Sequence, residues 1–237
     1  MDFGLKYSEE NTIIHCLDAD TVVSSCYLSK IVNSYKHNNI RALIVDFEHQ
    51  TDSNEYINKN IKYYEVFLKK TAKKIDQSGS PYGYVSLGPT ITCLAKTYVS
   101  IGGMVTKKAT EDFYFLQKIR KFTEIYFLKD KLVFPSSRIS DRVYLGTGFR
   151  MNESIENMDS IRKLYYSNNS FDILKKTIPA ILSMHNKNLR ALKEKLFSID
   201  EFLEHFFFKE GLFNIWIRIN NESKTKDQFE LQFHKWF

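Results

Sequence analysis

Short apolar runs alternate with amphipathic stretches over the first 150 residues of the chain. Residues 11–17 and 40–47 are nearly continuous apolar runs of strand length, which is typical of strands buried on both faces of a sheet. Residues 84–94 are similar but are interrupted at Gly88-Pro89, and residues 131–134 suit a last short strand. Helical spacing of apolar residues appears between these runs, over residues 24–36, 54–75, 96–101 and 110–122. This alternation predicts an α/β fold in which helices flank a mixed sheet.

The pattern changes near residue 150. From Ser154 onward only helical spacing is present, over residues 154–166, 170–183, 185–197, 199–209 and 226–236. The sequence therefore predicts an α/β domain over residues 1–150 and an all-helical C-terminal region over residues 151–237.

The basic excess of the chain lies in its first part. The formal net charge is +6; residues 1–150 hold 21 Lys and Arg against 16 Asp and Glu (net +5), and residues 151–237 hold 13 against 12 (net +1). This distribution suits an anionic substrate such as a nucleotide, although solubility explains it equally well. No dense run of Lys and Arg indicates a nucleic-acid surface.

Three cysteines, Cys16, Cys26 and Cys93, are odd in number and widely spaced. We interpret them as reduced core residues of a cytoplasmic protein, because a disulfide framework needs paired cysteines. No apolar run reaches transmembrane length, and the residues after Met1 do not have the pattern of a signal peptide.

Two carboxylates follow the first apolar run, at Asp18 and Asp20. In an extended chain, side chains two residues apart point the same way, so the pair would present oxygen ligands to one site at a strand end. Close anions repel unless a cation lies between them, and a hard divalent ion prefers such ligands. Capping of the next turn is an equally good explanation for aspartates at a strand end.

A second acidic site is the triplet Thr110-Glu111-Asp112, which opens a helix seven residues after Gly102-Gly103. We expect Phe113, Leu116 and Ile119 to face inward. Helix capping by the Thr110 hydroxyl, with acidic residues in the first turn, would account for the triplet. In a cleft, one of the carboxylates would instead serve as a general base for an attacking hydroxyl.

A third cluster lies in a predicted loop with two arginines, Arg138 and Arg142, and the turn Gly146-Thr147-Gly148. Arginine holds phosphate oxygens in a bidentate manner, and glycines let backbone amides approach an anion. A surface loop with an Arg–Asp pair is the simpler alternative.

The order of these motifs resembles the family-2 glycosyltransferases with the GT-A fold, over about residues 1–150. The resemblance implies that Asp18 and Asp20 hold Mg²⁺ or Mn²⁺ on the diphosphate of a nucleotide-sugar donor. It further implies that Asp112 is the base, that Glu111 helps to bind the acceptor, and that Gly102-Gly103 forms the turn beneath the acceptor site. The implied reaction inverts the anomeric carbon and transfers the sugar to a glycan, a lipid-linked or another hydroxyl acceptor, as in polysaccharide biosynthesis. Arg138 and Arg142 are added here as candidate donor-binding residues, because no family motif assigns them.

The chain departs from the family at its start. Members of the family place a nucleotide-binding half before the strand that carries the two aspartates, and this chain begins just before that strand. We therefore expect the chain alone to bind donor poorly or not at all. A fragment of a longer protein, a split gene product whose other chain supplies the missing half, and an internal-start reading frame are the alternatives that remain open.

Two other functions fit parts of the sequence. Haloacid-dehalogenase-like phosphatases also end an apolar strand in Asp-x-Asp, with Asp18 then the nucleophile and Asp20 the acid/base group. However, Val22 stands where that family has Thr, and Glu111-Asp112 opens a helix after glycines instead of ending a strand. A non-catalytic module that binds a partner through the aromatic helical region is the second alternative.

Overall fold

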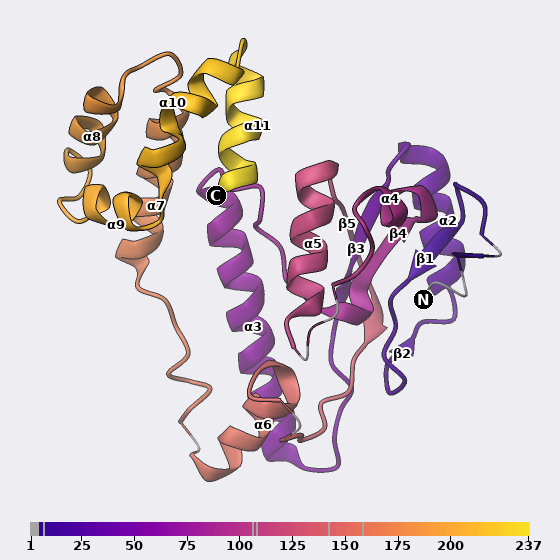
Figure 1. The fold of residues 1–237 in the computed structure, drawn as a ribbon. Helices are drawn as coiled ribbons and strands as arrows, with labels where there is room; N and C mark the ends of the chain where they lie inside the picture. The colour runs from indigo at the N-terminus through magenta and orange to yellow at the C-terminus, as the bar shows by residue number, and fades with distance from the viewer. Residues whose placement is uncertain (1–4, 7, 106, 108, 142, 158) are drawn as a thin grey trace. The chain divides into compact units, whose positions relative to one another are not determined.

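The computed structural model describes residues 5–6, 8–105, 107, 109–141, 143–157 and 159–237 (Figure 1). The chain divides into two compact units, one formed by residues 1–69 and 85–165 and the other by residues 70–84 and 166–237. The first unit holds the sheet, and the second is helical. The predicted α/β class, with a mixed sheet flanked by helices and a helical C-terminal region, is confirmed. The domain boundary expected at residue 150 stays a prediction.

Five strands of the described chain form one mixed sheet in the order β1-β4-β3-β5-β2. Their bounds are β1 Ile13–His15, β2 Val22–Val23, β3 Ala42–Phe47, β4 Ile91–Leu94 and β5 Tyr126–Phe134. β3 and β5 are parallel, whereas the pairs β1–β4, β3–β4 and β2–β5 are antiparallel. Each predicted strand is present, but β2 was not predicted because two residues carry no periodicity.

β3 lies in the middle of the sheet because its apolar run leaves no polar face. Leu43 and Val45 are fully buried in a core cluster with Tyr27 and Ile31, which lie on α2. The helices of this unit are α2 Tyr27–Asn38, the first part of α3 Glu55–Gln77, η1 Gly88–Thr90, α4 Ala95–Ser100, α5 Glu111–Phe122 and α6 Gly146–Glu156. α2, α3, α4 and α5 match the predicted ranges, whereas η1 occupies part of the strand predicted over residues 84–94, of which only β4 is a strand, and α6 also differs.

α6 begins at Gly146, so the helix predicted over residues 154–166 is wrong in its placement. The glycines of the segment suggested a turn, yet Met151 is buried against Ile57, Ile61 and Tyr64 of α3. The burial of one long side chain therefore outweighs the weak helix propensity of the glycines.

On α5 the buried residues are Phe115, Leu116 and Ile119, and Phe113 is exposed, so the prediction that Phe113 faces inward is wrong. At 100° per residue, positions 115, 116 and 119 share one narrow arc, whereas position 113 lies outside it. The face of α5 that packs against the core therefore includes Phe115 in place of Phe113.

The helical unit is built around Trp216, whose indole N–H donates a hydrogen bond to the carbonyl of Lys187 at 3.0 Å. Its helices are α7 Asn168–Leu182, α8 Leu189–Phe197, α9 Leu203–Lys209, α10 Leu212–Glu222 and α11 Lys226–Trp236. α10 was not predicted, although it supplies Leu212, Phe213, Trp216 and Ile219 to the core.

Candidate functional site

The two aspartates after β1 lie in a turn. The backbone N–H of Cys16 still donates to the carbonyl of Ile91 at 3.0 Å, so the chain remains beside β4 just past β1. The backbone N–H of Thr21 then donates to the carbonyl of Asp18 at 3.1 Å and closes a turn before β2. The argument from an extended chain, in which the side chains of Asp18 and Asp20 point the same way, is therefore wrong for this segment.

Asp20 is paired with Arg138, which joins two of the predicted donor-binding residues. The Nε atom of Arg138 lies 2.6 Å from Oδ2 of Asp20, and the arginine side chain is 65% exposed. An exposed pair of this kind adds little to stability, so its main effect is to fix where the guanidinium and the carboxylate lie. Arg142, the other predicted arginine, lies outside the described residues.

Asp112 is half-buried near the start of β4. Burial raises the pKa of its carboxyl, and the like charge of Glu111 adds to this rise, although hydrogen bonds from the backbone of Phe113 and Gly88 oppose it. A Cβ atom built on Gly88 would lie 3.9 Å from Cβ of Asp112, so the two residues are in contact distance. A carboxyl with a raised pKa is a better proton acceptor when it is ionised, as general base catalysis requires.

Thr110 does not cap α5 with its hydroxyl, which corrects the capping interpretation. Its backbone is left-handed, with φ of 66°, and its Oγ1 donates to the carbonyl of Ala109 at 2.5 Å. The acidic residues that follow still benefit from the positive end of the helix dipole.

The register of the sheet brings the first acidic turn toward Asp112. β1 pairs antiparallel with β4, with His15 opposite Thr92, and the Cys16–Ile91 hydrogen bond extends this pairing by one residue. The chain leading to Asp18 therefore runs toward η1, the short helix that contains Gly88 and precedes β4. Because Asp112 contacts Gly88, both acidic segments lie at the same end of β4.

Gly102 and Gly103 form the turn after α4, as the sequence predicts. Both have left-handed backbones, with φ of 72° and 67°. A Cβ atom on Gly103 would lie 3.0 Å from the Tyr98 ring, whereas one on Gly102 would meet nothing within 4 Å. Lys118 of α5 donates to the carbonyl of Gly103 at 3.4 Å, so this turn is tied to the helix that opens with Glu111 and Asp112.

The acidic residues fit a divalent cation only in part. Among the residues that the structure describes, no three His, Cys, Asp or Glu side chains are grouped so that they could hold a metal ion. Mg²⁺ is nevertheless often bound by one or two carboxylates together with phosphate oxygens of a substrate. Asp18 and Asp20 supply hard oxygen ligands of that kind, so their chemistry suits a cation whose shell the substrate completes, whereas the turn in which they lie does not by itself direct both carboxylates to one point.

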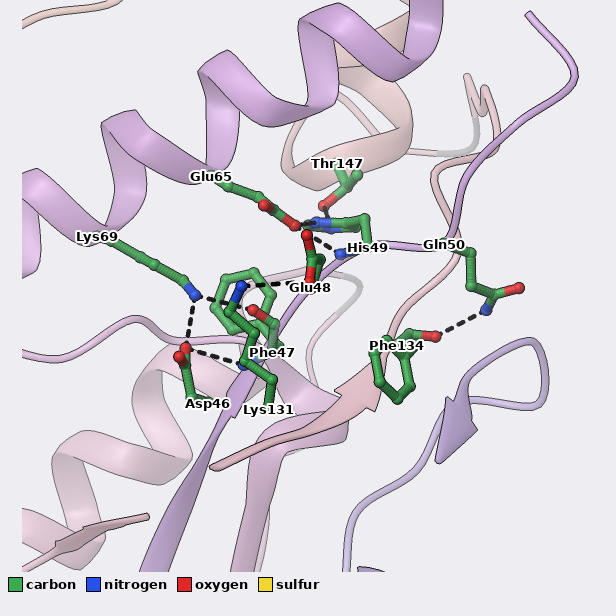
Figure 2. Close-up of polar contacts among 10 residues, drawn as sticks. All are labelled: Asp46, Phe47, Glu48, His49, Gln50, Glu65, Lys69, Lys131, Phe134 and Thr147. Carbon is green, nitrogen blue, oxygen red and sulfur yellow. Dashed lines mark hydrogen bonds and ion pairs between the residues drawn. The ribbon is translucent and has the colours of Figure 1, made fainter. Parts of the chain in front are cut away.

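Two residues that sequence reasoning missed, His49 and Gln50, follow β3 (Figure 2). The side-chain amide of Gln50 donates to the carbonyl of Asp20 at 2.8 Å and to the carbonyl of Phe134 at 2.7 Å. Gln50 therefore joins the acidic turn to the end of β5. The signal was present in the sequence, because polar residues directly after a buried strand are the same pattern that marked Asp18 and Asp20.

His49 is buried directly after β3 and contacts two other elements (Figure 2). Its Nδ1 atom lies 2.8 Å from Oε1 of Glu65 on α3, and its Nε2 atom lies 3.2 Å from Oγ1 of Thr147 on α6. These contacts connect the end of the central strand to the first turn of α6.

Comparisons with known proteins give likenesses to solved structures alone. No family model matches the chain, and no curated protein is similar to it. Among solved structures, the chain is similar to S. aureus TarS, residues 1–349, in complex with UDP-GlcNAc, with 14% sequence identity and a TM-score of 0.40. That likeness covers 98% of this chain, and the chain spans 58% of the TarS chain. Within the described residues, no helix has the length and hydropathy needed to cross a membrane.

Proposed function

We propose that this chain carries the cation-binding and acceptor-binding part of an inverting, metal-dependent glycosyltransferase. The single observation that supports the proposal is that the two acidic segments lie toward the same end of the strands of the sheet. The turn with Asp18 and Asp20 follows the strand paired with β4, and the carboxyl of Asp112, whose pKa burial raises, contacts Gly88 beside it. If these carboxylates share one site, their different environments would separate a proton acceptor from cation ligands.

In this proposal Asp112 acts on the acceptor. Its carboxylate accepts the proton of the acceptor hydroxyl while the hydroxyl oxygen forms a bond to the anomeric carbon of the sugar. The bond from that carbon to the nucleoside diphosphate breaks at the same time, so attack from the opposite face inverts the centre. Glu111 and the turn at Gly102-Gly103 flank the acceptor side, because Lys118 ties that turn to α5.

The donor side of the proposed site belongs to Asp18, Asp20 and Arg138. A bound Mg²⁺ or Mn²⁺ would neutralise charge on the leaving diphosphate. Asp18 and Asp20 would hold that ion, and Arg138 would place its guanidinium on a diphosphate oxygen while it stays beside Asp20. Arg142 remains a proposed donor-binding residue.

We further propose that a separate chain supplies the pocket for the nucleobase and ribose, and that transfer takes place in the cytoplasm. The proposed acceptor is a glycan, a lipid-linked or another hydroxyl compound. On this view, the chain recognises the diphosphate but not the base of the donor.

Manganese pyrophosphate is the probe that tests the proposal, since it presents the diphosphate without a nucleobase. We expect the purified chain to bind Mn²⁺ and pyrophosphate together, measured by equilibrium dialysis of labelled pyrophosphate against the chain with and without Mn²⁺. Asp20→Asn should weaken this binding at least about tenfold, because it removes one anionic ligand. Asp172→Asn, which changes an exposed aspartate of α7 in the other unit, is the matched control and should bind like the wild type.

Two results would contradict the proposal. The first is wild-type protein that binds no Mn²⁺ with pyrophosphate, and the second is equal binding by Asp20→Asn. Hydrolysis of a generic aryl phosphate that Asp18→Asn abolishes would instead favour the phosphatase alternative.

A further inference from the structure

We propose that His49 is a positioning residue that holds Arg138 in place through Thr147 and the start of α6. The part of this inference that concerns how rigidly residues 136–141 are held does not depend on any reaction. Its consequence for ligand binding rests on the proposed function.

The first step is the state of His49. Burial alone would raise the pKa of Glu65, but the hydrogen bonds from the His49 side chain and backbone, together with the nearby charges of His49 and Lys69, outweigh it and lower that pKa. The carboxylate of Glu65 therefore only accepts, so Nδ1 of His49 carries a hydrogen. The Nε2 atom of His49 lies 3.2 Å from Oγ1 of Thr147, and the two atoms share a hydrogen bond whichever of them donates.

The second step is the anchoring of His49 itself. Its side chain is fully buried and that of Glu65 is 13% exposed, so the pair has little solvent to compete with it. The backbone N–H of His49 also donates to Oε1 of Glu65, at 2.5 Å. Lys69, one helical turn further along α3, is bound to Asp46 at 2.6 Å and to the carbonyl of Phe47 at 2.8 Å (Figure 2). The end of β3 is thus fastened to α3 at two places and forms a fixed support.

The third step leads from Thr147 to Arg138. Gly148, the next residue, is so close to the Arg138 segment (residues 136–141) that a Cβ atom on it would lie 2.7 Å from Cβ of Ser140 and 3.3 Å from the carbonyl oxygen of Arg138. The backbone N–H of Ser140 donates to the carbonyl of Gly148 at 3.1 Å. Fixing Thr147 therefore fixes the backbone on which Arg138 lies.

The fourth step is the near end of the same segment. The backbone N–H of Gln50, adjacent to His49, donates to the carbonyl of Pro135 at 2.9 Å. The Arg138 segment is consequently held at one end by Gln50 and at the other by His49 through Thr147. The side chain of Arg138 is mostly exposed, so the place of its guanidinium depends on the ion pair with Asp20 and on the backbone supports that carry the residue.

The test compares Thr147→Val with Thr147→Ser. Valine keeps the shape of threonine and removes the hydroxyl, whereas serine keeps the hydroxyl. The first measurement is amide hydrogen exchange without ligand, over peptides that cover residues 136–141 and 146–150. Thr147→Val should exchange about fivefold faster in these peptides, the effect of losing one neutral hydrogen bond, and Thr147→Ser should match the wild type. Thr71→Val, a half-buried threonine of α3 in the other unit, is the matched control.

The second measurement is the affinity for manganese pyrophosphate. We expect Thr147→Val to bind manganese pyrophosphate about fivefold more weakly and Thr147→Ser to bind it like the wild type. The unfolding midpoint of Thr147→Val should fall only as far as the loss of one hydrogen bond requires. Exchange rates in Thr147→Val within twofold of the wild type would overturn the inference, as would wild-type peptides without protection. A wild-type protein that binds no manganese pyrophosphate would count against the proposed function alone, because the exchange measurement still decides the role of His49.

Discussion

The Nε atom of Arg138 lies 2.6 Å from Oδ2 of Asp20, although the two residues are far apart in the sequence. Asp20 precedes β2 and Arg138 follows β5, and these two strands pair with Val22 opposite Phe134. The strand pairing therefore carries both residues to the same edge of the sheet. A cationic and an anionic group at one edge suit a ligand that brings both negative charge and a cation.

Replacing Arg138 tests the donor side of this pair. Arg138→Ala should lower the affinity for manganese pyrophosphate about tenfold, because one charged hydrogen bond to the ligand is lost. The free energy of unfolding should change by less than about 0.5 kcal/mol, because the pair is exposed. Arg190→Ala, which breaks the exposed pair with Glu194 on α8, is the control and should change neither quantity. Equal affinity of Arg138→Ala and wild type would remove Arg138 from the proposed site.

Asp112 should give the stability of the protein a distinct pH dependence. A carboxyl whose pKa is higher in the folded than in the unfolded state favours folding below its unfolded pKa, and this contribution is lost as the pH rises through the folded pKa. Asparagine does not titrate, so the unfolding free energy of Asp112→Asn lacks this decrease with pH. The variant should therefore gain stability relative to the wild type as the pH is raised from about 3.5 to 7. Urea unfolding across this range measures the difference. A difference that stays constant with pH would show that the pKa of Asp112 is not raised.

The same carboxyl should control the rate when a partner chain supplies the rest of the donor pocket. Because only the ionised form accepts a proton, the rate should rise with pH through a pKa above that of an ordinary aspartate. Asp112→Asn should lower kcat at least about a hundredfold with little change in KM for the donor, since loss of a general base costs that much. Release of the nucleoside diphosphate measures both constants. A variant that keeps its kcat would assign the base to another residue.

Gly102 and Gly103 offer a matched pair of substitutions with nearly equal backbone angles. Gly102→Ala should cost about 1 kcal/mol of unfolding free energy, because alanine is strained in a left-handed backbone. Gly103→Ala should cost about 1–2 kcal/mol more, because its Cβ atom would also press on the Tyr98 ring. Urea unfolding of the two variants compares the strain alone with the strain plus the clash. Equal costs would mean that the ring moves away freely.

Trp216 should dominate the stability of the helical unit. Trp216→Phe removes core volume and leaves the carbonyl of Lys187 without its indole donor, so we expect a loss of about 2–3 kcal/mol. Phe208→Leu, at an exposed aromatic residue of α9, should change stability by less than about 0.5 kcal/mol. Fluorescence of the remaining tryptophan or far-ultraviolet circular dichroism during urea unfolding distinguishes the two. Similar losses for both variants would place Trp216 outside the core of this unit.

Local sequence patterns predicted the helices and strands well where the apolar positions of an element form one continuous set. The ranges of α2, α3 and α5 follow from helical periodicity, and the range of β3 follows from its continuous apolar run. The start of α6 did not follow, because its glycines carry a local turn signal and only the burial of Met151 overrides it. α10 was not predicted from the sequence either. Its buried face is defined by the neighbouring helices that enclose Trp216, and the sequence of α10 alone does not show them.

The candidate site divides in the same way. By itself, the amino-acid sequence determined which residues are candidates for chemistry: the acidic pair Asp18 and Asp20, the triplet ending in Asp112, and Arg138. Only the tertiary structure decided which of them meet and in what state, including the Asp20–Arg138 pair, the raised pKa of Asp112 and the role of His49. The physical reason is that side-chain type and spacing act over a few residues, whereas burial and distant pairing depend on the order and register of the strands.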